Sequence, residues 1–150
     1  PIVVLIVEDQ CYVANVGDSR ALLSGNFNIL NSISEQGNKI YALSRDHKPN
    51  DELERKRIIE GGGQIYHRTT AQNIDSANPS KKEIIVGPLR VLPGRLSVSR
   101  TFGDAEAKLS KYGGNPKVVI AEPEIKSFKI SKDHDFIVLG CDGIFDKLSN

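Results

Sequence analysis

Cysteine and histidine are scarce in this chain: two cysteines and three histidines occur among 150 residues, and there is no tryptophan or methionine. No Cys and His residues stand at the short spacings of a zinc site, which argues against a structural zinc. Cys11 and Cys141 both lie in apolar, strand-like segments. We therefore expect two buried, reduced thiols, as is usual in an intracellular protein of the cytoplasm or nucleus.

Strong charge of one sign and long hydrophobic runs are also missing. The chain has 20 Lys and Arg against 19 Asp and Glu, and the two signs are interspersed. This balance argues against a nucleic-acid-binding surface or a polybasic membrane anchor. The apolar run Ile2–Val7 is too short to cross a bilayer and lacks the flanks of a signal peptide. We expect no nucleic-acid partner and no membrane partner.

What is present is enough for one domain with a hydrophobic core, since 39% of the 150 residues are hydrophobic. The sequence opens without Met inside a predicted strand, and it closes at Lys147–Asn150, where a helix is predicted to begin. This pattern indicates a piece of a larger domain.

Many short segments of apolar or alternating residues predict strands, and one stretch, Arg100–Lys111, has moderate helical character. Many strands of antiparallel type with separate helices indicate an α+β fold. The predicted strands are Ile2–Val7, Cys11–Val16, Arg20–Ser24, Asn28–Ile33, Ile40–Leu43, Gln64–His67, Val118–Ile120, Ile125–Ile130 and Phe136–Leu139.

A helix is predicted to follow Asp51, because Asp51 and Glu54 have the spacing of a capping box, and to stop at Gly61–Gly63. The charged run Glu52–Arg57 is interpreted as a solvated helix face. The polar run Arg68–Lys82 has no periodicity and predicts a long surface loop.

The most informative segment is the acidic turn after Phe136–Leu139, which we predict to be a buried strand. The Asp142-Gly143 step brings a carboxylate onto a tight turn, and a helical turn would place Asp146 on the same side, at about 5–6 Å between Cβ atoms. Two carboxylates that close are usually held by a cation, and oxygen ligands favour Mg²⁺ or Mn²⁺. On this segment alone, a solvated acidic turn is an equal alternative.

Two other segments carry acidic residues at turns. Asp18 follows Gly17 between two strands, where a plain β-turn with an Asp-to-backbone bond is the more common reading. Asp46-His47 has the residue types of a catalytic dyad. A helix-entry loop with a hydrogen-bonded His is favoured, because no Ser or Cys nucleophile motif accompanies it.

Six short motifs succeed one another along the chain. They are Val-Gly-Asp-Ser-Arg (16–20), Asp-His-Lys-Pro (46–49), Glu-x-x-Arg-Ile with Gly-Gly (54–62), Leu-Ser-Val-Ser-Arg-Thr-Phe-Gly-Asp (96–104), Ala-Glu-Pro-Glu (121–124) and Cys-Asp-Gly-Ile-Phe-Asp (141–146). In this order they resemble the metal-dependent protein Ser/Thr phosphatases of the PPM class, also called type 2C. The resemblance implies that residues 1–150 are the central to C-terminal part of such a catalytic domain.

The resemblance also implies a fold and a chemistry. The fold is a four-layer αββα sandwich of two mostly antiparallel sheets flanked by helices, of which this chain is a partial domain. In the family, two Mg²⁺ or Mn²⁺ ions at one end of the sandwich activate a water that hydrolyses phosphoserine and phosphothreonine monoesters. The implied partners are phosphorylated proteins, and the implied enzyme is an intracellular monomer.

Particular residues match the family's site. Asp142, with the adjacent Gly143, resembles a core metal ligand, and Asp18 and Asp146 resemble the pair that holds a weaker third metal. Four further residues of the motifs are interpreted as supporting the site: Ser19, Arg20, Arg100 and Asp104.

The sequence departs from the family pattern by lacking the N-terminal Asp-Gly-His-Gly segment, the upstream Arg that grips phosphate and the later Asp-Asn. We therefore expect no catalytic residue within this chain, with the general-acid His and the phosphate-binding Arg upstream, and an inactive isolated fragment. The alternatives are a non-catalytic (pseudophosphatase) regulatory or binding module of the same fold, or a cation-binding structural domain. Residues 66–90 are predicted to form a flap or insert beside the active site.

Overall fold

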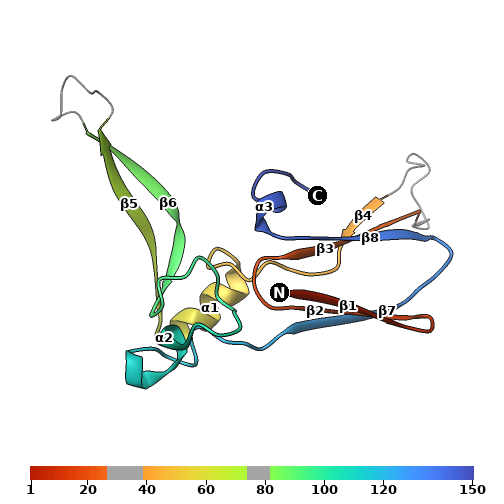
Figure 1. Cartoon of the computed structure of the whole chain (residues 1–150), viewed down its shortest axis with the longest axis horizontal. Helices are drawn as coiled ribbons and strands as arrows, with labels where there is room; N and C mark the ends of the chain where they lie inside the picture. The colour runs from red at the N-terminus through yellow and green to blue at the C-terminus, as the bar shows by residue number, and fades with distance from the viewer. Residues whose placement is uncertain (27–38, 74–81) are drawn as a thin grey trace. The chain divides into compact units, whose positions relative to one another are not determined.

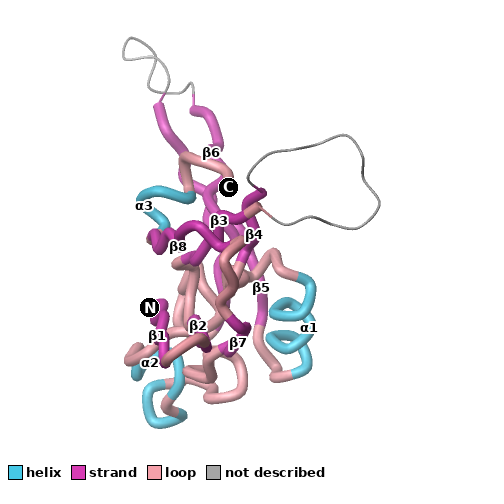
Figure 2. The backbone as a smooth tube through the Cα atoms, turned by 90° about the vertical axis from the view of Figure 1, so that its right-hand side faces the viewer, coloured by secondary structure: helices cyan, strands magenta, loops and turns pink. Residues whose placement is uncertain are grey.

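The structure is a computed structural model that describes residues 1–26, 39–73 and 82–150. These residues form two compact units, one made of Pro1–His47 with Ala121–Asn150 and the other of Lys48–Ile120. Antiparallel strands with a few short helices build both units, so the predicted α+β class is confirmed (Figures 1 and 2). No helix among the described residues is long and apolar enough to cross a membrane.

The first unit contains two three-stranded antiparallel sheets. One has the order β1 (Ile2–Val7), β2 (Gln10–Asn15), β7 (Glu124–Lys129), and the other has the order β4 (Lys39–Ala42), β3 (Arg20–Gly25), β8 (His134–Gly140). These six strands confirm the predictions for the same segments to within two residues at each end. The predicted strand Asn28–Ile33 lies outside the described residues.

The two sheets face each other across a small core (Figure 1). Side chains of a strand point alternately to its two faces, so Cys11 and Val13 of β2 meet Ala21 and Leu23 of β3, together with Leu43. These facing sheets are the two β layers of the predicted sandwich.

The expected burial of Phe136–Leu139 is wrong. Ile137 packs against the core, but Phe136 is 55% exposed and Val138 is exposed as well, because the other face of β8 is uncovered among the described residues. Leu139 is on the same face as Ile137 and is also exposed. The expectation of two buried thiols holds only for Cys11, whose pKa is raised by burial. Cys141 is exposed beyond the end of β8.

The second unit joins helix α1 (Glu52–Glu60) to a long hairpin of β5 (Gln64–Asn73) and β6 (Lys82–Leu92), followed by α2 (Ala105–Lys108) and a 3-10 turn. Figure 1 shows the hairpin as the two green strands labelled β5 and β6. The hydrophobic core of the second unit contains Ile58, Val91, Ala107, Val118 and Val119.

Three expectations for this unit need correction. The predicted surface loop is wrong over Arg68–Asn73, which continues β5, and at Lys82, which begins β6; the rest of that loop lies outside the described residues. Thr69 pairs with Val86 across the two strands, and such β-branched residues favour strand structure. The predicted strand Val118–Ile120 is a turn with buried valines, in which Ile120 alone forms a parallel bridge, with Arg100. Helix in the stretch Arg100–Lys111 is limited to α2 and the 3-10 turn.

The start and stop of α1 agree with the sequence. The Asp51 carboxylate accepts hydrogen bonds from Leu53 N at 3.0 Å and Glu54 N at 3.1 Å, and the helix ends at Gly61. A Cβ at Gly63 would lie 2.6 Å from a methyl of Val118, so this position has no room for a side chain. The glycines therefore end the helix and let the loop of residues 115–118 pack closely.

Candidate metal centre

The antiparallel register of β3 and β8 brings two acidic segments to one end of their sheet. Arg20 at the start of β3 pairs with Gly140 at the end of β8. Asp18 stands two residues before Arg20, and Asp142 two residues after Gly140. Asp18 and Asp142 therefore both lie just beyond the paired ends of β3 and β8, at the same end of the sheet.

The predicted helical turn after β8 is confirmed as α3 (Asp142–Phe145). Asp146 N donates to Asp142 O at 2.8 Å, so Asp146 follows one helical turn after Asp142 and both carboxylates lie on one exposed side. One oxygen of the Asp142 carboxylate also accepts a hydrogen bond from Gly143 N at 2.8 Å.

The turn that carries Asp18 is fixed by a buried histidine. Gly17, with a φ of +104°, donates from its N–H to His47 Nδ1 at 3.1 Å, and its carbonyl accepts from His47 N at 3.0 Å. Asn15 Nδ2 donates to the same carbonyl at 3.1 Å. The favoured interpretation of His47 as a hydrogen-bonded loop residue is confirmed, and Asp18 and Ser19 follow as half-buried residues.

Arg20 connects the loop at Asp46 to α3. Its guanidinium donates two hydrogen bonds to the Asp46 carboxylate, Nε to Oδ1 at 3.0 Å and Nη2 to Oδ2 at 2.8 Å. Its Cζ also lies 4.6 Å from the ring centroid of Phe145. The hydrogen bond to Asp46 raises the pKa of Arg20.

The other two predicted supporting residues belong to the second unit. Arg100 binds Oε1 of Glu54 with Nε at 3.1 Å and Nη2 at 2.5 Å. Asp104 is exposed, has a φ of +49° and precedes α2 without a side-chain capping hydrogen bond. Arg100 therefore supports a buried carboxylate within this unit.

That carboxylate, Glu54, is the residue that sequence reasoning missed. It is 1% exposed, so a solvated face for the whole run Glu52–Arg57 is wrong. Its Oε2 accepts hydrogen bonds from Ser99 Oγ at 2.6 Å and Arg57 Nη2 at 2.7 Å. A usable signal was its place four residues before Ile58, on the same helix face.

The cluster around Glu54 joins three segments of the second unit. Arg57 also donates to the carbonyls of Ser99 at 3.1 Å and Val118 at 2.8 Å. Burial alone would raise the pKa of Glu54, but the hydrogen bonds from Arg100, Arg57 and Ser99 outweigh it and lower the pKa to about 2. Glu54 is therefore a buried anion that ties α1 to the segment at Ser99–Arg100.

The donor types at the acidic end fit a hard cation, since Asp18, Asp142 and Asp146 offer carboxylate oxygens. Within residues 1–26, 39–73 and 82–150, however, no group of three or more His, Cys, Asp or Glu side chains is close enough to hold a metal ion. The described residues thus supply part of a metal site.

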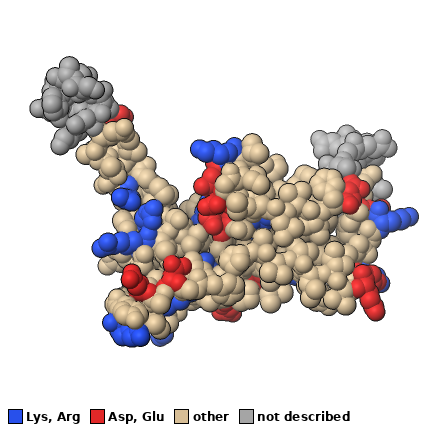
Figure 3. Space-filling model, in the orientation of Figure 1, with Lys and Arg blue, Asp and Glu red and all other residues tan. Residues whose placement is uncertain are grey.

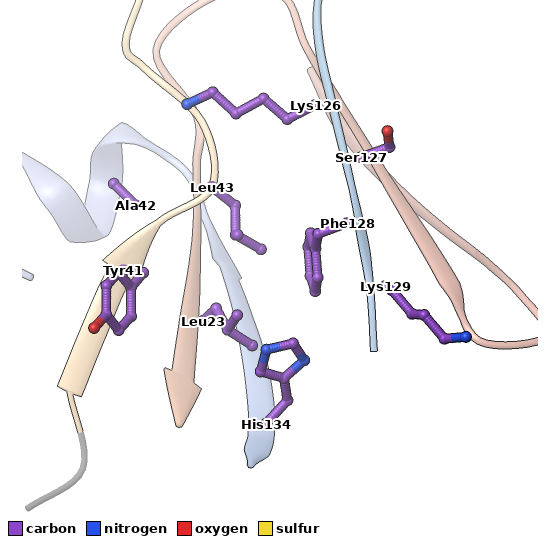
Figure 4. A pocket seen from close by; sticks show the side chains of 9 residues that line it. All are labelled: Leu23, Tyr41, Ala42, Leu43, Lys126, Ser127, Phe128, Lys129 and His134. Atoms are coloured by element: carbon purple, nitrogen blue, oxygen red, sulfur yellow. The ribbon is translucent and has the colours of Figure 1, made fainter. Parts of the chain in front are cut away.

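A separate hollow of about 600 Å³ opens between strands β4 and β7 of the first unit (Figure 4). Leu23, Leu43 and Phe128 make its apolar wall, and His134 packs edge-to-face on Phe128 at 5.3 Å between ring centroids. None of the predicted site residues lines it. On the face shown in Figure 3, acidic and basic side chains are interspersed.

Known proteins resemble this chain in sequence and in fold. The sequence profile described as "Protein phosphatase 2C" matches residues 1–150. The chain belongs to the protein phosphatase 2C family. Among its relatives, probable protein phosphatase 2C 60 of Arabidopsis thaliana is 34% identical over 149 residues, covering 99% of this chain and 32% of the relative. Probable protein phosphatase 2C 6 of Paramecium tetraurelia is 34% identical over 145 residues, covering 96% and 38%.

Solved structures share the fold. The structure of a C. elegans sex-determining protein matches with a TM-score of 0.64 and 27% identity over 95% of this chain and 26% of that one. Serine-threonine phosphatase 2C from Toxoplasma gondii matches with a TM-score of 0.64 and 19% identity over 99% and 42%. The chain spans about a third of the length of the curated relatives it matches and forms part of a PPM-type domain.

Proposed function

We propose that the full-length protein is a metal-dependent protein phosphatase that hydrolyses phosphoserine and phosphothreonine monoesters in other proteins. The family match along residues 1–150 supports this activity. The structural observation that carries it is the pairing of Arg20 with Gly140, which brings Asp18 and the Asp142–Asp146 turn to one end of the sandwich. Bound Mg²⁺ or Mn²⁺ supplies the activated water in this chemistry.

The proposal gives the acidic residues separate tasks. Asp142, with the backbone of Gly143, would hold a core ion, while Asp18 and Asp146 would hold a third, weaker ion. Few carboxylates suffice for such a site because Mg²⁺ keeps several of its waters. The proposed general acid and phosphate-binding residue lie outside this chain.

The full-length protein and the isolated chain are expected to behave differently. The full-length protein should hydrolyse a phosphothreonine peptide with Mn²⁺ and lose this activity in excess EDTA. The isolated residues 1–150 should show no appreciable turnover of p-nitrophenyl phosphate with Mn²⁺, because they lack part of the ligand set. Both rates are measured by phosphate or p-nitrophenol release.

One outcome would contradict the proposed function and another the expected inactivity of the isolated chain. A full-length protein that Mn²⁺ stabilises against heat without any turnover would be a cation-binding or pseudophosphatase module. Turnover by residues 1–150 alone would contradict their expected inactivity and show that the chain carries a complete site.

We also propose that the β5–β6 hairpin selects protein substrates. Its ladder exposes apolar side chains, with Ile84 68% and Val86 60% exposed, and surface segments that present such side chains often bind partners. Thr69 pairs with Val86, so removing residues 69–86 shortens both strands together.

In the full-length enzyme, replacing residues 69–86 by Asn-Gly should change the ratio of kcat/KM between two phosphoprotein substrates at least about fivefold, a loss of about 1 kcal/mol of differential binding. Turnover of p-nitrophenyl phosphate should stay within about twofold, because so small a substrate needs no protein contact. Equal losses on all substrates would assign the hairpin a structural role.

A further inference from the structure

We propose that Asp46 and His47 are positioning residues for the candidate metal centre. Through two separate contacts, these neighbouring residues fix the Asp18 turn and α3, the two segments that carry the acidic side chains. This inference rests on the proposed function and extends it to residues that touch neither metal nor substrate.

His47 holds the Asp18 turn from inside. Its ring accepts from Gly17 N and its backbone donates to Gly17 O, so the residue before Asp18 is bound on both sides. Because Nδ1 accepts a hydrogen bond, the proton of the neutral ring lies on Nε2, which is 3.5 Å from a carboxylate oxygen of Glu124. Arg45 Nη2 lies 3.2 Å from the same oxygen. The ring is fully buried, and the hydrogen bond from Gly17 N fixes its orientation.

Asp46 acts on α3 through Arg20. Its two oxygens bind the guanidinium in the bidentate arrangement, which fixes the plane of the guanidinium as well as its position. The guanidinium lies over the ring of Phe145, the residue directly before Asp146. By fixing the guanidinium of Arg20, Asp46 therefore helps to fix the position of the helical turn that carries Asp142 and Asp146.

The loop at Asp46 and His47 contacts the Asp18 turn directly and α3 through Arg20, and an ion bound between these two segments needs both of them in fixed positions. Carboxylates on separate turns repel each other, and the small Mg²⁺ ion requires near-octahedral oxygen positions. Residues that hold metal ligands in place matter for the metal: removing such a residue typically lowers metal affinity or activity about 10–100-fold. We therefore expect Asp46 and His47 to act on the affinity of the ion that Asp18 and Asp146 share.

A matched pair of substitutions separates positioning from mere stability. In His47→Asn, the amide oxygen stands near the place of Nδ1 and can accept from Gly17 N. In His47→Gln, the amide lies near the place of Nε2 and that acceptor is lost. We measure the dissociation constant of Mn²⁺ at its weakest site in the full-length protein. His47→Gln should raise this constant by a factor of about ten or more, and His47→Asn should raise it less than about threefold.

Mn²⁺ binding is measured without substrate, from the electron paramagnetic resonance of free Mn²⁺, beside the melting temperature. Asp46→Asn tests the other contact, because its amide group cannot accept from the second guanidinium nitrogen. It should also weaken that site about tenfold. Val13→Ala is the control, since it removes core methyls of the same unit and should lower the melting temperature without changing the dissociation constant.

Different results would contradict the positioning role and the proposed function. If the wild-type protein binds Mn²⁺ and is active, but His47→Gln and His47→Asn weaken binding equally or no more than Val13→Ala, the positioning role is wrong and the proposed function stands. If the wild-type protein binds no Mn²⁺ at millimolar concentration, the proposed function itself is wrong.

Discussion

Glu54→Gln in the full-length protein is expected to lower the free energy of unfolding by about 3 kcal/mol at pH 7. The Glu54 carboxylate is 1% exposed and receives hydrogen bonds from Arg100, Arg57 and Ser99. An amide accepts at only one atom, so it leaves part of this buried donor set unpaired, which is among the more costly changes in a protein interior.

The pH dependence of this effect has a definite sign. The pKa of Glu54 is lowered from 4.5 to about 2, so the folded state binds its proton less readily than the unfolded state. The stabilisation is complete above about pH 4.5 and is lost as the pH falls from there toward 2. In the Gln variant, this part of the acid sensitivity should disappear.

The measurement is urea unfolding of both proteins between pH 3 and 7, compared as a difference so that other carboxylates cancel. Glu60→Gln is the control on the same helix, because Glu60 is exposed and pairs with Lys56 at only 3.9 Å. It should cost less than about 0.5 kcal/mol. A difference between wild type and Glu54→Gln that stays constant with pH would show that the charge of Glu54 is not what stabilises the cluster.

Asp142→Asn is expected to lower kcat/KM for a phosphothreonine peptide at least about 100-fold in the full-length protein, the upper end of what even an indirect partner of a metal contributes. The substitution preserves the shape of the side chain, and its amide oxygen can still accept from Gly143 N. The negative charge is removed and one carboxylate oxygen becomes an amide nitrogen on an exposed residue, so the fold should persist while affinity for a divalent cation falls.

The neighbouring carboxylate provides a contrast. Asp146→Asn should raise the Mn²⁺ concentration needed for half-maximal activity about tenfold, with a smaller loss at saturating Mn²⁺, because Asp146 is proposed to hold the weaker ion. Asp135→Asn, an exposed residue at the opposite end of β8, is the control and should leave both values unchanged. Equal effects of Asp142→Asn and Asp146→Asn would contradict their assignment to different ions.

Local patterns were sufficient for much of the fold. The alternating side chains of Cys11 and Val13, the capping residue Asp51 and the stop at Gly61 act within a few residues, and the structure confirms what they predict. The order of the six motifs was sufficient for the family. The hairpin was recognised only in part, because both faces of β5 are largely exposed and its residues therefore lack the alternation that marks a half-buried strand.

The sequence by itself determined the α+β class, the family and the acidic residues that its motifs contain, because strand periodicity, capping and turn chemistry depend on neighbours along the chain. Only the tertiary structure decided the partners of those residues. Burial of Glu54 depends on Arg100, 46 residues away, and the clamp on Gly17 depends on His47, 30 residues away. The sequence does not show whether a charged residue or a histidine has such a partner in the fold. A polar side chain can be buried and stabilise the fold only when such a partner satisfies its hydrogen bonds.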